Sequence, residues 1–260
     1  MAQIISIVNQ KGGVGKTTTA INLACYLATL GKFVLLVDMD PQANATSGLG
    51  IDYNKLDKGI YEALLGLHNI KDVILNTAVA GYKIAPSTLN LAGANVELVN
   101  LENRELKLDQ ALLSVRNDYD YIIIDCPPSL GLLTLNCLVA AEKLLIPVQA
   151  EYYALEGLGQ LIKTINLIKT HIKADLDILG AVLTMYDKRT KLSEEILHQL
   201  YQYFPNRIFR SVIPRNVRLT EAPSFGKTIL EYDPKSKGAK AYERLAREII
   251  DLTNTNINYY

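Results

Sequence analysis

Long apolar runs are missing from this 260-residue chain, and cysteine is scarce. No apolar run reaches the roughly 18 residues needed to cross a bilayer, so no membrane span is expected. The three cysteines, Cys25, Cys126 and Cys137, show no CxxC spacing. This spacing argues against a metal site or a disulfide and favours small buried side chains in a reducing cytosol. A signal peptide is not expected either, because Ile4 to Val8 leads straight into a glycine-rich loop instead of a cleavage site.

The net charge of the chain is zero, but basic and acidic residues are unevenly distributed along the sequence. The chain carries 27 Lys and Arg against 27 Asp and Glu, yet residues 180–247 hold 13 basic against 7 acidic residues. Residues 1–179 hold 14 basic against 18 acidic residues. A basic C-terminal third beside an acidic body suggests a face for a polyanion, although the count fits an ordinary solvated surface equally well.

Short apolar runs alternate with helical patterns along most of the chain, and apolar residues make up 49% of it, enough for a large core. Buried strands are predicted at 4–8, 33–37, 121–124, 144–148, 178–184 and 208–213. Helices are predicted at 16–30, ending at Gly31, at 155–171, and at 194–203, starting from Ser193. The alternation predicts an α/β fold with a doubly wound, mostly parallel sheet and helices on both faces. Residues 50–115 show no clear pattern, and no linker divides the chain, so a single domain spanning 1–260 is expected.

A glycine-rich loop stands between the first predicted strand and the first helix. Its residues are Lys11, Gly12, Gly13, Val14, Gly15, Lys16 and Thr17. Such a loop presents backbone N–H groups and the positive end of a helix to phosphate. The general P-loop pattern has glycine where this chain has Gln10. We expect Lys16 to reach the β/γ-phosphates of ATP and the Thr17 hydroxyl to bind Mg²⁺, with Lys11 as an additional cation, so ATP hydrolysis is predicted.

Carboxylates follow two of the predicted strands. Asp125 ends the 121–124 strand and is suited to hold Mg²⁺ through water, and the loop 127–129 after it can sense the γ-phosphate. Asp38 and Asp40 lie at the carboxyl end of the neighbouring strand, where ligands sit in open α/β sheets. We expect Asp40 to contribute to the Mg²⁺ site, together with Thr17 and Asp125, and to lie near the attacking water. For Asp38, a structural hydrogen-bond acceptor and a catalytic role both remain open.

Three segments carry a family resemblance. The run from Lys11 to Thr18 is similar to the deviant Walker A box of the MinD/ParA-type P-loop ATPases. The run 38–42 with Asn44 resembles the following segment of chromosome-partitioning ParA proteins of the Soj type, and 213–218 with 221–224 resembles their C-terminal signature. The resemblance extends from residue 2 to about 250.

This resemblance implies a homodimer that sandwiches two ATP molecules. Lys11 would cross to the other subunit's phosphates, Asp40 would position the attacking water, and Pro214 and Asn216 would line the adenine. The resemblance also implies slow hydrolysis stimulated by a ParB-type centromere-binding protein, in chromosome or plasmid segregation. The protein would be cytoplasmic and nucleoid-associated. No helix-turn-helix segment precedes the first strand, so operator binding is not expected.

The family further implies ATP-dependent, sequence-independent binding to double-stranded DNA, which requires only cations spaced along the phosphate backbone. Arg189 and Arg218 match positions where such proteins carry DNA-contacting arginines. The other candidates in the basic segment are Lys188, Lys191, Arg215, Lys227, Lys235 and Lys237. For the last three of these, an ordinary solvated surface is an equally good interpretation.

Three rival functions can be weighed against this one. A membrane-binding ATPase would end in a basic amphipathic helix, and Ala241, Leu245 and Ile249 do form an apolar stripe, but core packing explains the stripe better. A metabolic enzyme built on the same loop would need a second substrate motif, which we do not find. A reductase with a bridging iron cluster would need cysteines that the chain does not place together.

Overall fold

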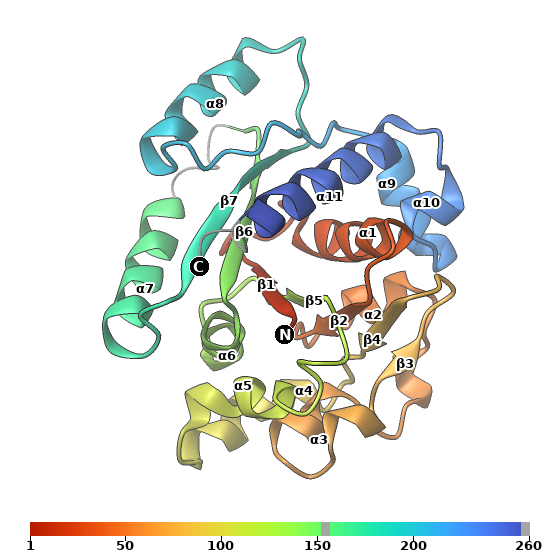
Figure 1. Ribbon diagram of the computed structural model, residues 1–260, viewed down its shortest axis with the longest axis vertical. Coiled ribbons are helices and arrows are strands. Elements are labelled where there is room, and N and C mark those ends of the chain that lie inside the picture. The colour runs from red at the N-terminus through yellow and green to blue at the C-terminus, as the bar shows by residue number, and fades with distance from the viewer. Residues whose placement is uncertain (152–156, 256–260) are drawn as a thin grey trace.

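The structure is a computed structural model that describes residues 1–151 and 157–255, and it contains one twisted seven-stranded sheet between two layers of helices (Figure 1). The strands are β1 (Gln3–Ile7), β2 (Val34–Asp38), β3 (Leu75–Asn76), β4 (Tyr82–Ala85), β5 (Tyr121–Asp125), β6 (Lys143–Gln149) and β7 (Asp177–Thr184). Their order in the sheet is β3-β4-β2-β5-β1-β6-β7. Only the β3–β4 pair is antiparallel; every other neighbouring pair is parallel.

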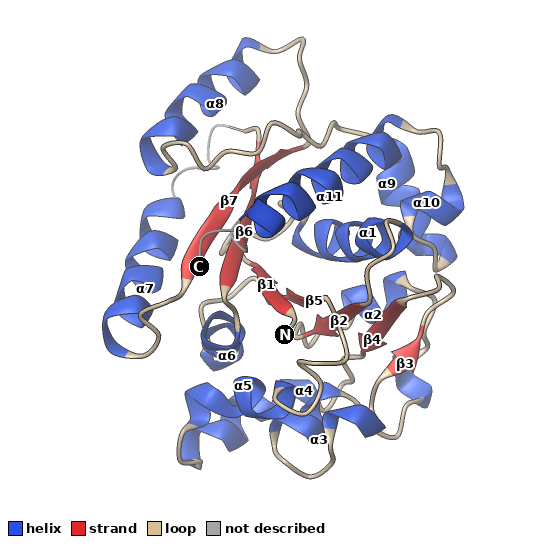
Figure 2. Ribbon diagram, viewed as in Figure 1, coloured by secondary structure: helices blue, strands red, loops and turns tan. Residues whose placement is uncertain are grey.

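Helices connect the strands and cover the sheet (Figure 2). They are α1 (Lys16–Thr29), α2 (Asn44–Gly48), α3 (Ile60–Leu64), α4 (Leu91–Glu97), α5 (Lys107–Leu112), α6 (Leu132–Ala140), α7 (Leu158–His171), α8 (Lys191–Tyr203), α9 (Val217–Glu221), α10 (Ile229–Tyr232) and α11 (Lys237–Thr255). Short 3₁₀ turns lie at Tyr53–Lys55, Ile70–Asp72, Leu98–Asn100, Arg104–Leu106 and Ala222–Phe225.

Each central strand is apolar on both sides, because successive side chains point to opposite faces of the sheet. In β1, Ile4 packs into a core shared with helices α3 to α8, whereas Ile5 packs into a second core shared with α1 and α11. Burial on both faces requires near-continuous apolar strands. The predicted doubly wound fold is therefore confirmed.

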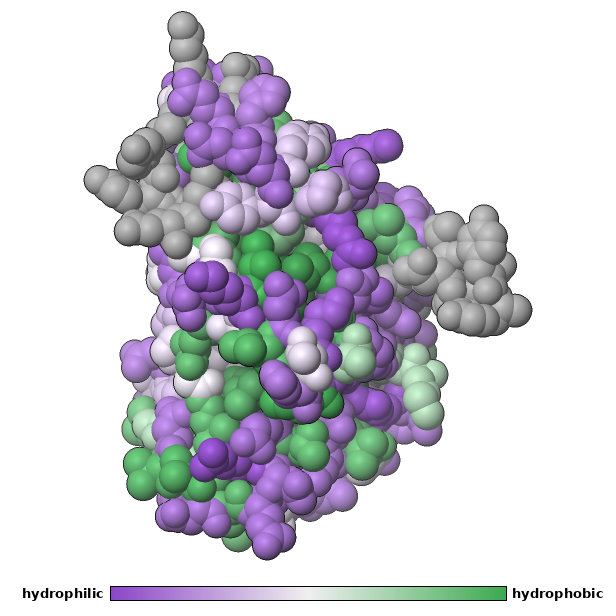
Figure 3. All heavy atoms as spheres, turned by 90° about the vertical axis from the view of Figure 1, so that its left-hand side faces the viewer, coloured by the Kyte–Doolittle hydropathy of each residue, from purple (hydrophilic) through white to green (hydrophobic). Residues whose placement is uncertain are grey.

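The C-terminal helix α11 lies alongside α1 on one face of the sheet (Figure 1). Its apolar stripe, Ala241, Leu245 and Ile249, is fully buried in that layer. Core packing thus accounts for the stripe, as predicted. No helix in the described part of the chain is both long and apolar enough to span a bilayer. On the face that carries α7 and α8, apolar residues are interspersed with polar ones (Figure 3).

Two sequence predictions about the C-terminal half need correction. The run 208–213 is not a strand; it meets the sheet edge through an isolated parallel bridge, Ala181 to Ile208, and a second bridge, Tyr186 to Pro214, follows the run. Ser193 does not precede its helix, because α8 begins at Lys191. Thr190, in an extended conformation, is the N-cap residue, and the Ser193 hydroxyl lies 2.8 Å from the Thr190 hydroxyl. The helix predicted at 16–30 is α1, which ends one residue earlier, at Thr29, and Gly31 follows with a φ of 85°.

The predicted helix 155–171 corresponds to α7, which begins at Leu158; its first predicted residues, 155–156, lie outside the described residues. The unassigned stretch 50–115 contains β4, which pairs with β2, together with the short antiparallel strand β3 and helices α3 to α5. These elements extend the sheet beyond β2 and bring the segment after β4 to the carboxyl edge of the sheet.

Candidate functional site

The loop from Gly12 to Gly15 leaves the carboxyl end of β1 and enters α1. Gly13 and Gly15 have φ values of 76° and 88°, in the left-handed region that side chains with a Cβ rarely adopt. The first N–H groups of α1 have no intrahelical partner and are open to an acceptor outside the helix. A loop of this kind at a helix N-terminus is suited to cradle an anion.

Lys16 begins α1, and its side chain folds back over the loop. The Lys16 Nζ donates a hydrogen bond to the Lys11 carbonyl oxygen at 3.2 Å, and only 7% of Lys16 is exposed. Burial lowers the pKa of Lys16 below its usual value, while the carboxylates of Asp125 and Asp40 act in the opposite direction. The loop thus holds a cation close to two carboxylates, where a phosphate would compete for it.

Asp125 ends β5 directly beside the loop, because β5 pairs with β1 and Ile7 lies opposite Asp125. The carboxylate is fully buried, and neither of its oxygens accepts a hydrogen bond of regular geometry from the described residues, although the Thr17 hydroxyl is close enough to stabilise its charge. Burial raises the pKa of Asp125 well above its usual range, Asp38 adds to the shift, and the Thr17 hydroxyl and Lys16 oppose it.

Two free carboxylate oxygens beside a threonine hydroxyl match the hard oxygen ligands that Mg²⁺ takes. The residues present therefore fit Mg²⁺, which Asp125 and Thr17 would hold from the protein side. In the part of the chain that the structure describes, no group of three or more His, Cys, Asp or Glu side chains could hold a metal alone. Phosphate and water oxygens would have to complete the coordination, as is usual for Mg²⁺.

Asp38 and Asp40 differ in their contacts, which bear on the question that the sequence leaves open. Asp38 is fully buried and accepts hydrogen bonds from the Thr46 N–H at 2.8 Å, the Thr46 hydroxyl at 2.7 Å and the Asp40 N–H at 3.2 Å. Burial raises the pKa of Asp38 to about 6, and the bonds from Thr46 act against that rise. These contacts favour the structural interpretation of Asp38, whereas Asp40 lines the cavity.

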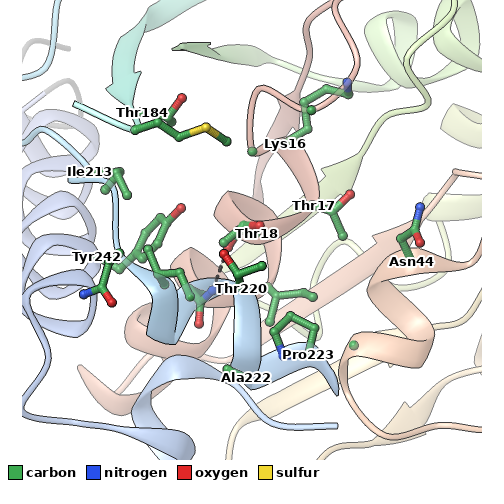
Figure 4. A pocket seen from close by; sticks show the side chains of 18 of the residues that line it. Lys16, Thr17, Thr18, Asn44, Thr184, Ile213, Thr220, Ala222, Pro223 and Tyr242 are labelled. Carbon is green, nitrogen blue, oxygen red and sulfur yellow. Dashed lines mark hydrogen bonds between the residues drawn. The ribbon is translucent and has the colours of Figure 1, made fainter. Parts of the chain in front are cut away.

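A cavity of about 720 Å³ joins the loop to the C-terminal part of the chain (Figure 4). Thr17 and Thr18 at the start of α1 line it together with Ile213 and Pro223 from the C-terminal part of the chain (Figure 4). Pro214 and Asn216, which the family resemblance places at the adenine, are also part of its wall, although they lie about 200 residues after the loop in the sequence. The volume lies within the range of small-molecule sites.

Every residue predicted to bind nucleotide or metal can now be placed. Those that line the cavity are Gly12, Gly13, Gly15, Lys16, Thr17, Thr18, Asp40, Pro214 and Asn216. Val14 is buried beneath the loop, and Lys11 is half-buried at its start. The structure brings these residues together at the carboxyl edge of the sheet, and their individual roles remain predictions.

Several cavity residues carry no sequence prediction. The Thr184 hydroxyl at the end of β7 donates to the Val14 carbonyl oxygen at 2.8 Å and so fixes the base of the loop. Its place at the carboxyl end of a predicted strand is a signal that could have identified it. Tyr242 reaches the cavity from α11, where nothing local in the sequence distinguishes it from a core residue.

The two arginines matched to DNA contacts are both exposed and both ion-paired. Arg189 Nη2 lies 2.6 Å from Asp187 Oδ2, and Arg218 Nη1 lies 2.9 Å from Glu221 Oε2 with Asp233 at 3.6 Å from its Nε. The hydrogen bond that Arg218 donates to the Glu221 carboxylate raises the pKa of Arg218. Both arginines lie in the upper half of the molecule in Figure 1, on α9 and on the segment leading into α8.

The remaining DNA candidates fall into two groups. Arg215 and Lys227 line the cavity, and Arg215 Nη2 also lies 3.2 Å from Glu151 Oε1. Lys188, Lys235 and Lys237 are exposed, and the side chain of Lys191 lies outside the described residues. The structure therefore leaves Lys235 and Lys237 free to face a polyanion, while it places Arg215 and Lys227 nearer the nucleotide.

Comparisons with known proteins extend the likeness over nearly the whole chain. A family model described as an AAA domain matches residues 2–178. The chain is 53% identical over 249 residues to the sporulation initiation inhibitor protein Soj of Bacillus subtilis, covering 96% of this chain and 98% of that protein. It is also 53% identical over 250 residues to the chromosome partitioning protein ParA of Myxococcus xanthus, covering 96% and 88%. The crystal structure of cobyrinic acid a,c-diamide synthase from Mycobacterium smegmatis with bound ADP and magnesium is 37% identical, with a TM-score of 0.88 and coverage of 98% and 97%.

Proposed function

The chain belongs to the Soj/ParA family of chromosome-partitioning ATPases, and on that premise we propose that it is a nucleotide-switched ATPase that binds DNA in its ATP-bound, dimeric form. We propose that the whole chain acts as one catalytic domain and that it works in the cytoplasm on the nucleoid. A ParB-type protein would be the partner that stimulates its slow hydrolysis.

One observation supports the nucleotide site most strongly: a buried Asp125 carboxylate that accepts no hydrogen bond of regular geometry from the described residues lies next to a glycine loop that presents N–H groups. An anion on the loop and a cation beside Asp125 would satisfy both. In this proposal Lys16 neutralises the β/γ-phosphates, and Thr17 and Asp125 hold Mg²⁺. Bound Mg²⁺ supplies charge neutralisation on the phosphates.

Hydrolysis would depend on Asp40 and Lys11. Asp40 lines the cavity and would orient the attacking water at the γ-phosphate. Lys11 is half-buried at the start of the loop, and its carbonyl oxygen, not its ammonium group, contacts Lys16. Its ammonium group would then be available to the phosphates of a second subunit, where a cation supplied in trans stabilises transferring phosphoryl groups.

DNA binding would couple to this site through the C-terminal third. Pro214 and Asn216 line the cavity, and the Asn216 side chain accepts a hydrogen bond from the Arg218 N–H at 2.9 Å, capping α9. A nucleotide seated against Asn216 therefore lies two residues from a predicted DNA contact. Dimerisation would double the number of phosphates that such cations neutralise, which explains a switch from weak to strong binding.

The experiment that tests the proposal measures phosphate release from Mg-ATP alone, with duplex DNA, and with DNA plus a ParB-type partner, using Lys16→Ala as the inactive control. We expect slow release that rises when DNA and the partner are both present. The likeness to a cobyrinic acid a,c-diamide synthase raises a metabolic alternative. Turnover that ignores DNA and partner but requires a small carboxylic acid would contradict the proposal in favour of that alternative.

A further inference from the structure

Asp40 and three other buried residues form a closed ring of hydrogen bonds. The Ser87 hydroxyl donates to the Asp40 carbonyl oxygen at 2.8 Å, and the Ser87 N–H donates to the Thr46 Oγ1 at 3.0 Å. The Thr46 hydroxyl donates to Asp38 Oδ2 at 2.7 Å, and Asp38 Oδ1 accepts from the Asp40 N–H at 3.2 Å. Each link therefore connects to the next, and the ring starts and ends on the backbone of Asp40.

The ring joins three segments, of which the one that carries Ser87 is distant from the other two in the sequence. Asp38 ends β2, Thr46 lies in α2, and Ser87 follows β4. Asp38, Thr46 and Ser87 are all 0% exposed, so water does not compete for these bonds. Buried polar networks in which every member is satisfied are rigid, because each bond is stronger in a low-dielectric interior.

The ring holds the main chain of Asp40 and leaves its side chain to the cavity. Both backbone polar groups of Asp40 are engaged, since its carbonyl oxygen also accepts from the Ala43 N–H at 2.9 Å. Its Oδ1 accepts from the Gln42 N–H at 3.0 Å, and its Oδ2 accepts no hydrogen bond from residues that the structure describes. A group that must act on a substrate needs such support, because misplacement by about 1 Å can cost about 10²-fold in rate.

We propose that Ser87 and Thr46 are positioning residues for ATP hydrolysis, which hold Asp40 at the phosphate end of the cavity without touching the nucleotide. Neither residue lines the cavity. The inference rests on the proposed role of Asp40 and extends it to two residues outside the glycine loop and the C-terminal signature. Loss of either hydroxyl should therefore slow the chemical step and spare nucleotide binding.

Ser87→Ala is the direct test, since it removes the bond to Asp40 and keeps the Ser87 backbone bond to Thr46. The Asp40 carbonyl oxygen keeps its bond from Ala43, so the fold should survive. We expect single-turnover hydrolysis to fall by about 10- to 100-fold, while the calorimetric affinity for Mg-ATP and the KM stay at wild-type values.

Ser6→Ala is the matched control. The Ser6 hydroxyl is also fully buried and donates to a backbone carbonyl, that of Cys137, at 2.7 Å. It should lower the thermal midpoint as much as Ser87→Ala does, with no loss of hydrolysis beyond what the stability change explains. An equal loss of hydrolysis in both variants would overturn the positioning role and leave a general effect of stability.

Thr46→Val and Thr46→Ser give an independent test by rescue. Valine keeps the shape but removes the hydroxyl, so hydrolysis should fall; serine keeps the hydroxyl and should restore it. Wild-type rates in Ser87→Ala and Thr46→Val would overturn the inference if Asp40→Ala is inactive. Wild-type rates in Asp40→Ala as well would instead contradict the proposed role of Asp40, and with it the basis of the inference.

Discussion

Arg189 and Arg218 offer a quantitative test of the proposed DNA surface. Changing both to alanine removes two exposed cations from each subunit, and so four from a dimer. Each neutralised phosphate contributes about 0.9 to the slope of log K against log salt, so we expect the slope for the ATP-bound dimer to become shallower by up to about 3.6. Over a fourfold rise in salt, wild-type binding should then weaken by about 10²-fold more than binding by the variant.

The ion pairs of the two arginines determine how much of the expected change in salt slope is observed. Arg189 lies 2.6 Å from Asp187, and Arg218 lies 2.9 Å from Glu221, so each arginine must exchange a carboxylate for a phosphate when DNA binds. Exposed pairs of this kind are weak and are screened by salt. We therefore expect most of the change in slope to appear, together with weaker binding at low salt caused by the unpaired carboxylates that remain.

The assay is fluorescence anisotropy of a duplex without any special sequence, titrated in saturating Mg-ATP at several salt concentrations. Lys55→Ala with Lys71→Ala is the matched control. These lysines are ion-paired too, and their side chains are 83% and 52% exposed, against 84% and 53% for Arg189 and Arg218. An unchanged slope in the arginine variant, or the same change in the lysine control, would refute the assignment.

Other changes address the nucleotide site and the fold. Lys16→Ala should abolish ATP binding, because Lys16 is the cation that the loop places next to Asp125; unaltered affinity in calorimetry would contradict this. Asp40→Ala should bind ATP without hydrolysing it, and gel filtration with ATP should show persistent dimers; normal turnover would remove Asp40 from the chemistry. Lys11→Ala should fold but fail to dimerise, with turnover reduced by as much as about 10³- to 10⁵-fold; an ATP-dependent dimer of normal mass would exclude a role in trans. Gly226→Ala should lower stability by at least about 1 kcal/mol, since Gly226 has a φ of 63° and an added Cβ would lie 2.6 Å from the Cα of Gly50; an unchanged denaturation midpoint would contradict the strain.

The elements that the sequence predicts correctly are those whose signal is local. Strands β1, β2 and β5 are mostly apolar because both faces are covered, although β1 contains Ser6. Gly13 and Gly15 mark the loop, where the backbone needs the left-handed conformation. A strand such as β4 is harder to predict, because it is four residues long and its Lys83 is exposed. The run 208–213 shows the opposite error: it is apolar like a strand, but it reaches the sheet edge only at an isolated bridge.

At the site, too, the sequence predicts what has a local signal and misses what depends on contacts between segments. Asp38 and Asp40 look alike in the sequence, and only their contacts separate them: Asp38 uses both oxygens inside the protein, whereas Asp40 lines the cavity. Ser87 lies 47 residues after Asp40, and no spacing rule connects the two. Contacts between distant segments depend on how β4 and β2 pair, which a single sequence does not specify.

The central claim is that the nucleotide state controls DNA binding. It is tested most directly by a mobility shift of duplex DNA with the protein in ATP, with the protein in ADP, and with the Asp40→Ala protein in ATP. We expect a shift in ATP, little or none in ADP, and the most persistent shift with Asp40→Ala, which should hold ATP without hydrolysing it. Equal shifts in all three would contradict a nucleotide-gated DNA-binding ATPase.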